Sequence, residues 1–297
     1  MSAEPGRASA GLPAHLEWTH PSGRVLRLDF TKPLIMGILN LTPDSFSDGG
    51  LFFEPGKAID RARALIGEGA DILDLGAETT RPGSLPTSAE EEWRRLGPVL
   101  EALSKIDGCP PVSVDTYKSE VAAKAIGLGA SMLNDIYAGR KDPSILKVAA
   151  ESGVPIVLMH MQGEPRTMQA DPHYDDVVTE VRDFLLERAK AAEDAGVAPS
   201  RIILDPGLGF GKNRDHNLSL LRHFDTAMPR EYRAMMALSR KAFLGQILGG
   251  AAPGDRDLVT AVASSFAVLK GADIVRVHNV APTREALLVA REVMAAA

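Results

Sequence analysis

A set of polar side chains, each at or near the end of a short apolar run, is the part of this sequence best suited to chemistry. Its members are Asn40, Asp115, Asn134, Asp205, Lys241, Arg276 and His278. Carboxylates such as Asp115 and Asp205 accept hydrogen bonds from ring or exocyclic N–H groups. Lys241 donates to ring nitrogens and carbonyl oxygens, and the Asn134 amide does both. This mixture predicts that the ligand is a polar heterocycle with an amidine-like edge.

The apolar runs alternate with segments of helical periodicity, and this alternation predicts the fold. The runs cover residues 34–39, 71–75, 111–114, 131–133, 155–159, 201–204, 233–238 and 273–277. The helical segments cover 58–68, 89–104, 119–126, 143–151, 177–195 and 258–270. Repeated strand–helix units of this kind predict a (β/α)₈ TIM barrel, whose C-terminal strand ends form one rim that carries the site. An open, doubly wound parallel sheet is the alternative fold.

Glycines and turn residues predict where the elements begin and end. Gly69, Gly129, Gly153 and Gly271 each stand between a helical segment and the next strand. Because glycine adopts a left-handed backbone without steric cost, these residues predict helix stops. Two short runs around a Pro-Ser-Gly turn at 16–30 predict a β-hairpin before the barrel. We expect a flexible tail over residues 1–15 and a single barrel domain over 16–297.

The last predicted strand supplies groups suited to a phosphate. Arg276 and His278 lie two residues apart on it, beside Asn40 at the end of the first strand. Barrels often bind phosphate at this place, and an arginine there forms forked, charge-assisted hydrogen bonds. Asn40 can bind Mg²⁺ through its amide oxygen. The motifs show neither a Ser–His nor a Cys–His pair of the kind that activates a side-chain nucleophile.

Two motifs that suggest other chemistry fail on their spacing. The segment GLGFGK at 207–212 looks like a phosphate loop, but Pro206 and Asn213 stand where that loop needs Gly and Ser or Thr. His160 has no HExxH partner, so we expect a packed histidine at a strand end rather than a zinc ligand.

Composition restricts the class of protein. The chain has 297 residues, of which 45% are hydrophobic, and its formal net charge of −6 argues against a broad nucleic-acid-binding face. The single cysteine, Cys109, excludes an internal disulfide and favours a reducing compartment. No apolar run has the length of a membrane span, and the first dozen residues lack the apolar region of a secretory signal. We expect a cytoplasmic protein without membrane contact.

Several motifs together resemble the signatures of the dihydropteroate synthases, the folate-pathway enzymes of the pterin-binding family. They are GILNLTPDSFSDGG at 37–50, GAETTRPGS at 76–84, SVDT at 113–116, LNDI at 133–136, LMHMQGEPRTMQ at 158–169, LDPGLGFGKN at 204–213, SRK at 239–241 and RVH at 276–278. The resemblance implies condensation of 6-hydroxymethyl-7,8-dihydropterin pyrophosphate with 4-aminobenzoate, assisted by Mg²⁺, in a homodimer. Pyrophosphate would depart first, and the electron-rich pterin would stabilise the cation that the arylamine attacks.

The resemblance also implies a role for each matching residue. The pterin contacts are Asp115, Asn134, Met159, Asp205, Phe210, Lys241 and Arg276. The pyrophosphate group comprises Asn40, Arg276 and His278, and Asn40 is the Mg²⁺ ligand. The aminobenzoate contacts are Phe46, Thr80, Arg81, Pro82 and Ala242. The catalytic residues are Asn40, Asp48, Lys241, Arg276 and His278. Loops at 42–48 and 80–84 are expected to close over the reacting centre as lids.

The sequence departs from the family pattern at Ala77, Ala237, Ala242, Val259 and Asn279. Ala237 adds a methyl group beside the expected pterin pocket. Ala242 lacks a hydroxyl that can bind the aminobenzoate carboxylate, which leaves helix N–H groups for aminobenzoate and for competing sulfonamides. A catalytically silent pterin-binding homologue and a corrinoid-dependent methyltransferase are therefore the alternatives. The intact SRK and TPDSFSDGG motifs favour the synthase.

Overall fold

The barrel in this protein is closed. The structure, a computed structural model, describes residues 11–42, 55–79 and 85–296. Eight parallel strands follow one another around the barrel, and the last of them pairs with both the first and the seventh. The strands are β3 (Leu34–Asn40), β4 (Ile72–Gly76), β5 (Val112–Asp115), β6 (Met132–Asp135), β7 (Ile156–Met159), β8 (Ile202–Asp205), β9 (Arg233–Met236) and β10 (Ile274–Val277). The TIM-barrel prediction is thus confirmed, and the open sheet is excluded.

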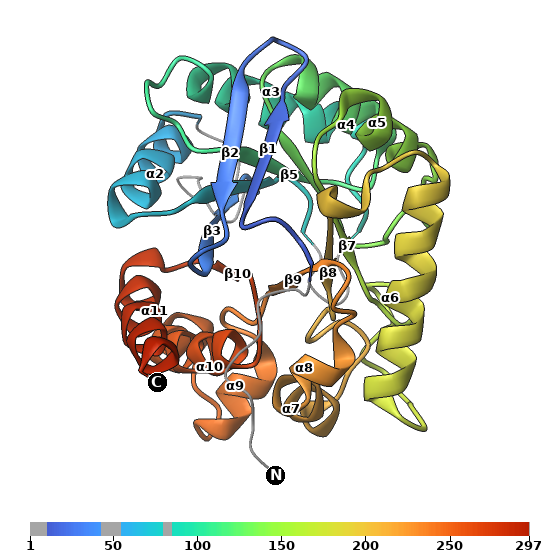
Figure 1. Cartoon of the computed structure of the whole chain (residues 1–297), viewed down its shortest axis with the longest axis vertical. Helices are drawn as coiled ribbons and strands as arrows, with labels where there is room; N and C mark the ends of the chain where they lie inside the picture. The colour runs from blue at the N-terminus through green and yellow to red at the C-terminus, as the bar shows by residue number, and fades with distance from the viewer. Residues whose placement is uncertain (1–10, 43–54, 80–84, 297) are drawn as a thin grey trace.

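Helices surround the strands, as Figure 1 shows. They are α2 (Pro55–Glu68), α3 (Ala89–Leu103), α4 (Ser119–Gly127), α5 (Ser144–Ser152), α6 (Val177–Asp194), α7 (Arg214–Arg222), α8 (Phe224–Ala227), α9 (Ala242–Ile247), α10 (Asp257–Leu269) and α11 (Val280–Ala295). The four glycines predicted to stop helices all have positive φ angles, between 67° and 104°. Helices α2, α4, α5 and α10 therefore end one or two residues before these glycines, and the next strand starts within a few residues. No helix in the described ranges has both the length and the apolar character that crossing a bilayer requires.

Strand register brings the predicted site residues to one face. Asn40 pairs with Gly76, Gly76 with Asp115, and Asp115 with Asn134. Paired residues of neighbouring parallel strands point to the same side of a sheet, as do residues two apart in one strand. Asp74 therefore lies on the same face as Gly76, one step deeper in the barrel.

The other half of the barrel continues this face. Met159 pairs with Asp205, and Arg276 pairs with Met36. Met36 lies four residues before Asn40 in β3, so the two side chains point to the same face. Arg276 also bonds to Asp74, although β3 separates their strands. Only a side chain inside the barrel can make that contact, so this shared face is the interior.

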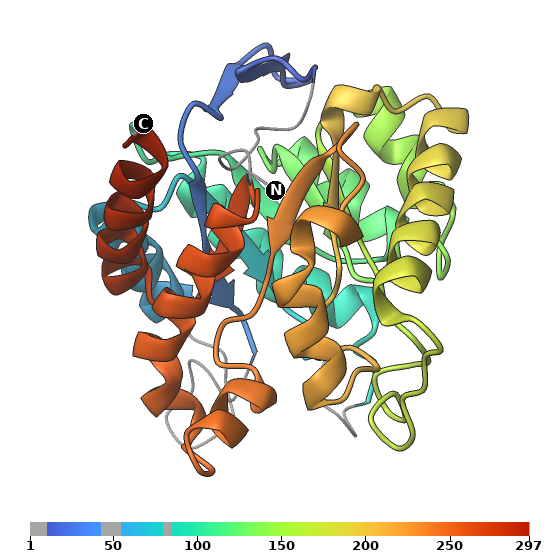
Figure 2. The ribbon, with the colours of Figure 1, turned by 60° about the horizontal axis from the view of Figure 1, so that its bottom comes forward.

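An antiparallel hairpin covers the N-terminal end of the barrel. It consists of β1 (His15–Thr19) and β2 (Val25–Asp29), and it lies at the opposite end from α9 (Figure 2). The ring of the buried residue His20 lies 3.0 and 3.1 Å from the carbonyl oxygens of Ile126 and Ala130. The predicted hairpin is confirmed. His15, within the segment expected to be a tail, already belongs to β1, and residues 1–10 lie outside the described part.

A buried ion pair joins the hairpin end of the barrel to β9 and β10. Arg233 and Asp273 have side chains that are only 4% and 8% exposed, and their charged atoms are 3.0 Å apart. Asp273 also accepts a hydrogen bond from the Ala234 amide. Arg233 lies over the Phe30 ring and donates to the Pro13 carbonyl. One guanidinium therefore holds the two sheets and the incoming chain together.

We expect Asp273→Ala to destabilise the fold by about 3–5 kcal/mol, because it removes the carboxylate that pairs with the buried Arg233 guanidinium. Urea unfolding followed by circular dichroism measures the loss. Lys270→Ala is the matched control, since its pair with Asp225 is nearly half exposed and should contribute at most about 1 kcal/mol. Equal losses of stability in the two variants would show that the buried Arg233–Asp273 pair stabilises the fold no more than the exposed pair does.

Candidate active site

The structure places most of the predicted site residues together at the C-terminal rim. Asn40, Asp115, Met159 and Asp205 are the last residues of their strands, Asn134 and Arg276 lie within theirs, and Phe210, Lys241 and His278 follow β8, β9 and β10. Ala242 is the first residue of α9. Phe46, Asp48, Thr80, Arg81 and Pro82, with the rest of the two expected lids apart from Thr42, lie outside the described residues.

Arg276 connects two carboxylates at the centre of this rim. Its Nε lies 2.6 Å from the Asp74 carboxylate, and its Nη2 lies 2.9 Å from that of Asp115. Asn134 donates from Nδ2 to the same Asp74 oxygen at 3.2 Å. The group is therefore held as one hydrogen-bonded cluster before any ligand arrives.

Burial shifts the titration of the groups around this cluster. It raises the pKa of Asp115 to about 7, against the opposing attraction of Arg276, and that of Asp205 to about 6, against the Gly207 amide. Burial also lowers the pKa of Lys241 to about 8, although Asp205 favours its charged form. Asp115, Asp205 and Lys241 therefore have pKa values near neutral pH. Shifted pKa values of this kind are common in ligand-binding sites.

Apolar side chains form one wall beside the polar groups. Met159 and Phe210 belong to a buried cluster that also contains Ile136, Tyr137, Met161 and Met168. The ammonium group of Lys241 lies 4.2 Å from the centre of the Phe210 ring. A flat heterocycle bound here would have polar edge contacts and an aromatic neighbour.

The loop after β8 owes its shape to a buried lysine. Lys212 Nζ lies 2.8 Å from His160 Nδ1, 3.0 Å from the Gly207 carbonyl and 3.1 Å from the Phe210 carbonyl. Gly207 has φ of +64°, and a Cβ atom there would lie 1.9 Å from the His160 carbonyl oxygen, so only glycine fits. The glycines of this segment thus serve a tight loop that presents Phe210, rather than a phosphate loop.

His160 is a packed histidine, as its sequence context predicts. Its ring meets the edge of Phe184 at 4.7 Å. Burial, together with the nearby Lys212 charge, lowers its pKa to about 2, so the ring is neutral. Among the described residues no group of three His, Cys, Asp or Glu side chains is arranged to hold a metal.

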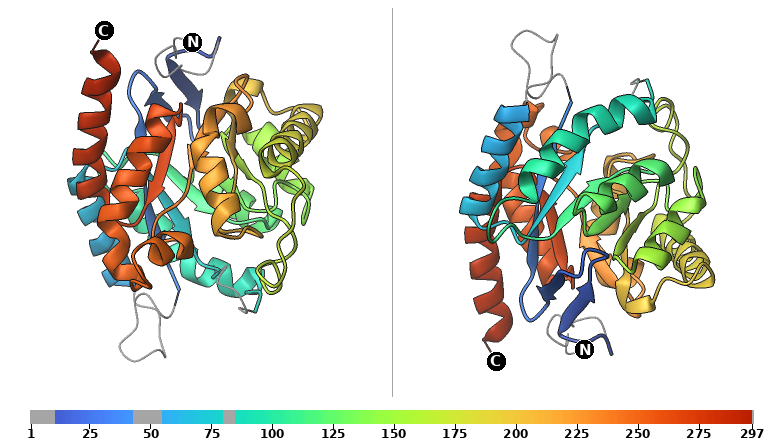
Figure 3. Two further views of the ribbon diagram at one scale, coloured as in Figure 1. Left: turned by 90° about the horizontal axis from the view of Figure 1, so that it is seen from below. Right: turned by 90° about the horizontal axis from the view of Figure 1, so that it is seen from above.

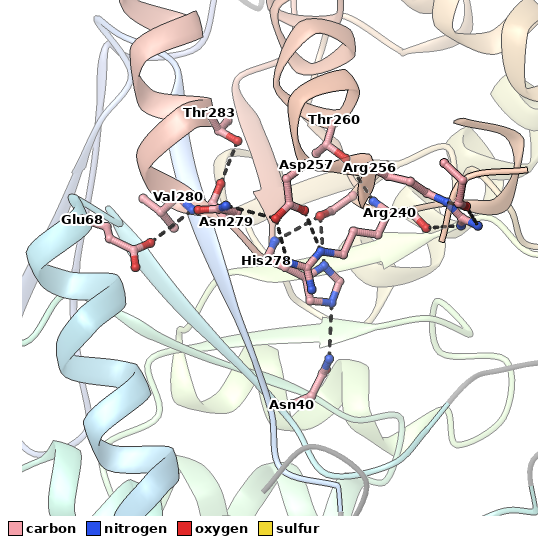
Figure 4. A network of polar contacts seen from close by, with 12 residues as sticks. Asn40, Glu68, Arg240, Arg256, Asp257, Thr260, His278, Asn279, Val280 and Thr283 are labelled. Atoms are coloured by element: carbon pink, nitrogen blue, oxygen red, sulfur yellow. Dashed lines mark hydrogen bonds and ion pairs between the residues drawn. The ribbon is translucent and has the colours of Figure 1, made fainter. Parts of the chain in front are cut away.

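A histidine, a serine and an asparagine meet at the expected phosphate end, where Figure 4 shows His278 and Asn40. Ser239 Oγ lies 2.9 Å from His278 Nδ1 and accepts the His278 backbone N–H at 3.1 Å. Asn40 Nδ2 lies 3.4 Å from His278 Nε2. Burial, aided by the charge of Arg276, lowers the pKa of His278 to about 3. His278 is thus a neutral hydrogen-bonding group at this end of the site.

This contact corrects the expectation that no Ser–His pair lies among the motifs. Ser239 and His278 come from different motifs, and only the β9–β10 pairing brings them together. The serine hydroxyl is buried and bonds twice to the same histidine. We therefore interpret Ser239 as a group that orients His278, not as a nucleophile.

Arg240 holds the segment between Ser239 and Lys241 in a strained conformation. Its φ of +58° lies in the left-handed region, which costs a residue other than glycine about 1–3 kcal/mol. Two bonds from its guanidinium to Asp257, at 2.6 and 2.8 Å, offset this cost (Figure 4). Thr260 accepts its amide, and Arg256 donates to its carbonyl. The start of α10 thereby fixes where Lys241 points.

One of the family departures, Asn279, has a structural explanation here. Asn279 donates from Nδ2 to Asp257 at 3.0 Å, so an amide suits a position that faces a carboxylate. Ala237 is buried beside the end of β9.

Sequence reasoning missed a second buried group, below the end of β4. Lys118 Nζ lies 2.6 Å from the Glu92 carboxylate and also bonds to Glu78. Glu92 is fully buried, which raises the pKa of its carboxyl although Lys118 opposes the shift. The group ties the chain leaving β4 to α3 and α4.

Asp74 was missed as well, although the sequence contains a signal for it. It is a charged residue inside an apolar strand, two positions before the residue that pairs with Asp115. Charged residues are rarely fully buried unless they are paired. Such a residue in a predicted barrel strand therefore indicates a partner across the barrel.

Comparison with known proteins agrees with this architecture. The pterin binding enzyme family matches residues 36–278, and the chain belongs to this family. It is 43% identical over 269 residues to the dihydropteroate synthase of Escherichia coli, an alignment that covers 91% of this chain and 94% of that protein. It is 47% identical to the mitochondrial folate synthesis bifunctional protein of Arabidopsis thaliana, with 85% of this chain covered but only 48% of the plant protein.

Solved structures of the dihydropteroate synthase from Xanthomonas albilineans have the same fold. The structure with 4-aminobenzoic acid is 43% identical, with a TM-score of 0.86 over 95% of this chain and 99% of that one. The complex with 7,8-dihydropteroate is 41% identical, with a TM-score of 0.84 over 95% and 100%. The likeness thus covers the whole barrel together with its hairpin.

We expect Asp205→Asn to stabilise the protein by about 1–3 kcal/mol at pH 8, since the raised pKa means that ionised Asp205 weakens the fold there. The gain should shrink below about pH 6, where folded wild-type protein binds the proton. Urea unfolding at pH 8 and pH 5 tests this. The variant should also lose most pterin affinity, because an amide offers one acceptor where the carboxylate offers two. If the variant is less stable than wild type at pH 8, ionised Asp205 does not weaken the fold, and the assignment of Asp205 as a ligand-binding group that lowers stability is contradicted.

Proposed function

We propose that the chain catalyses the dihydropteroate synthase reaction, the condensation of 6-hydroxymethyl-7,8-dihydropterin pyrophosphate with 4-aminobenzoate to give 7,8-dihydropteroate and pyrophosphate. The observation that carries the proposal is the strand-end cluster. It holds the buried Asp205, the half-buried Asp115, a buried amide and a half-buried lysine beside an aromatic wall, which suits the donor and acceptor edge of a pterin. Relatives named for this activity match nearly the full length of the chain, and one solved relative holds the product.

The polar groups of the rim would bind and orient the pterin. Asp205 and Asn134 accept from its N–H groups, and Lys241 donates to its carbonyl and ring nitrogen. Phe210 and Met159 pack against the ring and exclude water from it. Because these contacts fix the plane of the ring, the methylene carbon that carries pyrophosphate points toward the Arg276 and His278 end of the rim.

The phosphate end would stabilise the leaving group. Arg276 supplies the positive charge, and its Nε and Nη2 are already held by Asp74 and Asp115. His278 is neutral, so it supplies a hydrogen bond and no charge. Since the pterin stabilises the cation that forms, no side-chain nucleophile is required.

The groups around Asn40 fit a magnesium ion that is bound mainly by the substrate. Mg²⁺ commonly takes one or two oxygen ligands from a protein and the rest from phosphate and water. Asn40 Nδ2 is directed at His278, which leaves the amide oxygen as the end suited to a cation. When bound, the ion would neutralise pyrophosphate as it leaves.

The aminobenzoate side of the site rests on fewer described residues. Ala242 is exposed at the first position of α9 and has no hydroxyl. The α9 backbone N–H groups are therefore the donors that this part of the chain offers to the carboxylate of aminobenzoate. Phe46, Thr80, Arg81 and Pro82 remain predicted contacts.

We infer a homodimer from an apolar surface on two adjoining helices. Leu258, Val262 and Phe266 lie one turn apart on α10 and are 73%, 48% and 58% exposed. Val289 and Val293 on α11 are 66% and 58% exposed. The two helices run side by side on one flank of the barrel (Figure 3). Exposed apolar side chains on two adjoining helices are typical of a subunit interface.

We place the protein in the cytoplasm. Its one cysteine, Cys109, is buried and unpaired, as is usual for proteins of reducing compartments.

Purified protein should release pyrophosphate from 6-hydroxymethyl-7,8-dihydropterin pyrophosphate in a reaction that requires both 4-aminobenzoate and Mg²⁺. Chromatography of the product should show dihydropteroate, and excess EDTA should abolish the release. Pterin binding without turnover would instead support a silent homologue in which Ala237 and Ala242 block the second substrate. Methyl transfer to a corrinoid would support the methyltransferase.

Phe266→Glu should convert the dimer to a monomer, because it buries a charge in the centre of the proposed interface. Sedimentation velocity measures the change. Lys270→Glu, near the end of the same helix but outside the apolar surface, is the control and should remain dimeric. A wild-type protein that sediments as a monomer would contradict the assigned interface.

A further inference from the structure

Asp74 is the least exposed charged residue of the cluster, and none of the roles assigned above requires it to touch substrate. It lies in the middle of β4, inside the barrel, and is fully buried. A carboxylate at such a position is costly unless its partners compensate for the lost water. Its place in the fold therefore needs an explanation in terms of those partners.

The two partners of Asp74 are residues that we assign to the pterin. One oxygen, Oδ2, accepts from Arg276 Nε at 2.6 Å and from Asn134 Nδ2 at 3.2 Å. The other, Oδ1, is buried and has no hydrogen-bond partner in the described structure. A buried carboxylate with one unused oxygen adds little to stability, so its value lies in what it does to Arg276 and Asn134.

The contact with Asn134 decides which end of the amide faces the ligand. A side-chain amide has an accepting end and a donating end of nearly equal size, and it can rotate to exchange them. A carboxylate accepts but does not donate, so only the NH₂ end can turn toward Asp74. The Asn134 oxygen is then left for the ligand, which must supply an N–H group at that place.

The contact with Arg276 fixes the plane of the guanidinium group. Asp74 takes Nε and Asp115 takes Nη2, so the guanidinium cannot rotate without losing one of two charge-assisted bonds. Asp74 therefore orients an amide on one side and a cation on the other.

We propose that Asp74 is a positioning residue that sets the hydrogen-bond polarity of the pterin pocket. By holding Asn134 with its oxygen outward, it selects a ring that carries an amino group there and rejects one that carries an oxo group. The inference rests on the proposed pterin-binding function, although it does not require turnover.

Asp74→Asn tests this role, because the new amide has the same shape but can either donate or accept. Calorimetry gives the affinity of wild type and variant for pterin, which carries a 2-amino group, and for lumazine, which carries a 2-oxo group. We expect the variant to bind pterin more weakly and its preference for pterin over lumazine to fall by about tenfold or more. A general loss of structure would weaken both ligands alike and leave that preference unchanged.

Ser113→Ala is the matched control. Ser113 pairs with Asp74 in the neighbouring strand, is fully buried, and has a hydroxyl without a partner in the described structure. Its loss should leave both affinities as in wild type, and thermal unfolding should show that each variant is folded. Where Asp74→Asn does not fold, Asp74→Ser replaces it, because a hydroxyl can donate as well as accept and so no longer dictates the orientation of Asn134.

The outcomes separate the two hypotheses. Unchanged preference in a folded Asp74 variant overturns the positioning role, whether or not the affinity falls. Failure of wild-type protein to bind pterin overturns the proposed function itself. A reduced preference in the Asp74 variant, with Ser113→Ala unchanged, supports the role.

Discussion

The burial of opposite charges inside a closed barrel is the constraint on which this structure depends. Arg276 reaches across the interior to Asp74 and Asp115, while Asp205 and Lys241 lie at the same rim. Each group loses water, and each is tolerated because another of opposite sign is near. The same burial moves the titration of Asp115, Asp205 and Lys241 toward neutrality. These buried groups lower the stability of the protein without ligand. A ligand that supplies matching donors and acceptors therefore binds them favourably.

Other side chains of the rim form hydrogen bonds that keep these groups in place. Lys212 gathers the carbonyls of the loop that carries Phe210. Arg240 accepts an unfavourable backbone conformation so that Lys241 can point inward. Ser239 holds His278 by two bonds. None of these three contacts needs to touch a substrate, but each determines where a substrate-facing group lies.

Local patterns in the sequence predicted the fold and much of the rim. The eight strands, the hairpin and the glycine stops follow from periodicity and from turn chemistry, which act within a few residues. Asp74 and the Ser239–His278 pair did not follow, because their partners depend on register and closure. Arg276 and Asp74 are 202 positions apart in the chain, and although a charge inside an apolar strand indicates a partner, it does not identify which residue that partner is. The aminobenzoate contacts on 43–54 and 80–84 lie outside the described structure and remain predictions.

Helix α10 has two faces with different tasks, and this arrangement links assembly to the site. Its first turns hold Arg240 through Asp257 and Thr260, while Leu258, Val262 and Phe266 form the exposed apolar surface proposed as the subunit interface. Association of two subunits through that surface would therefore be coupled to the backbone that precedes Lys241.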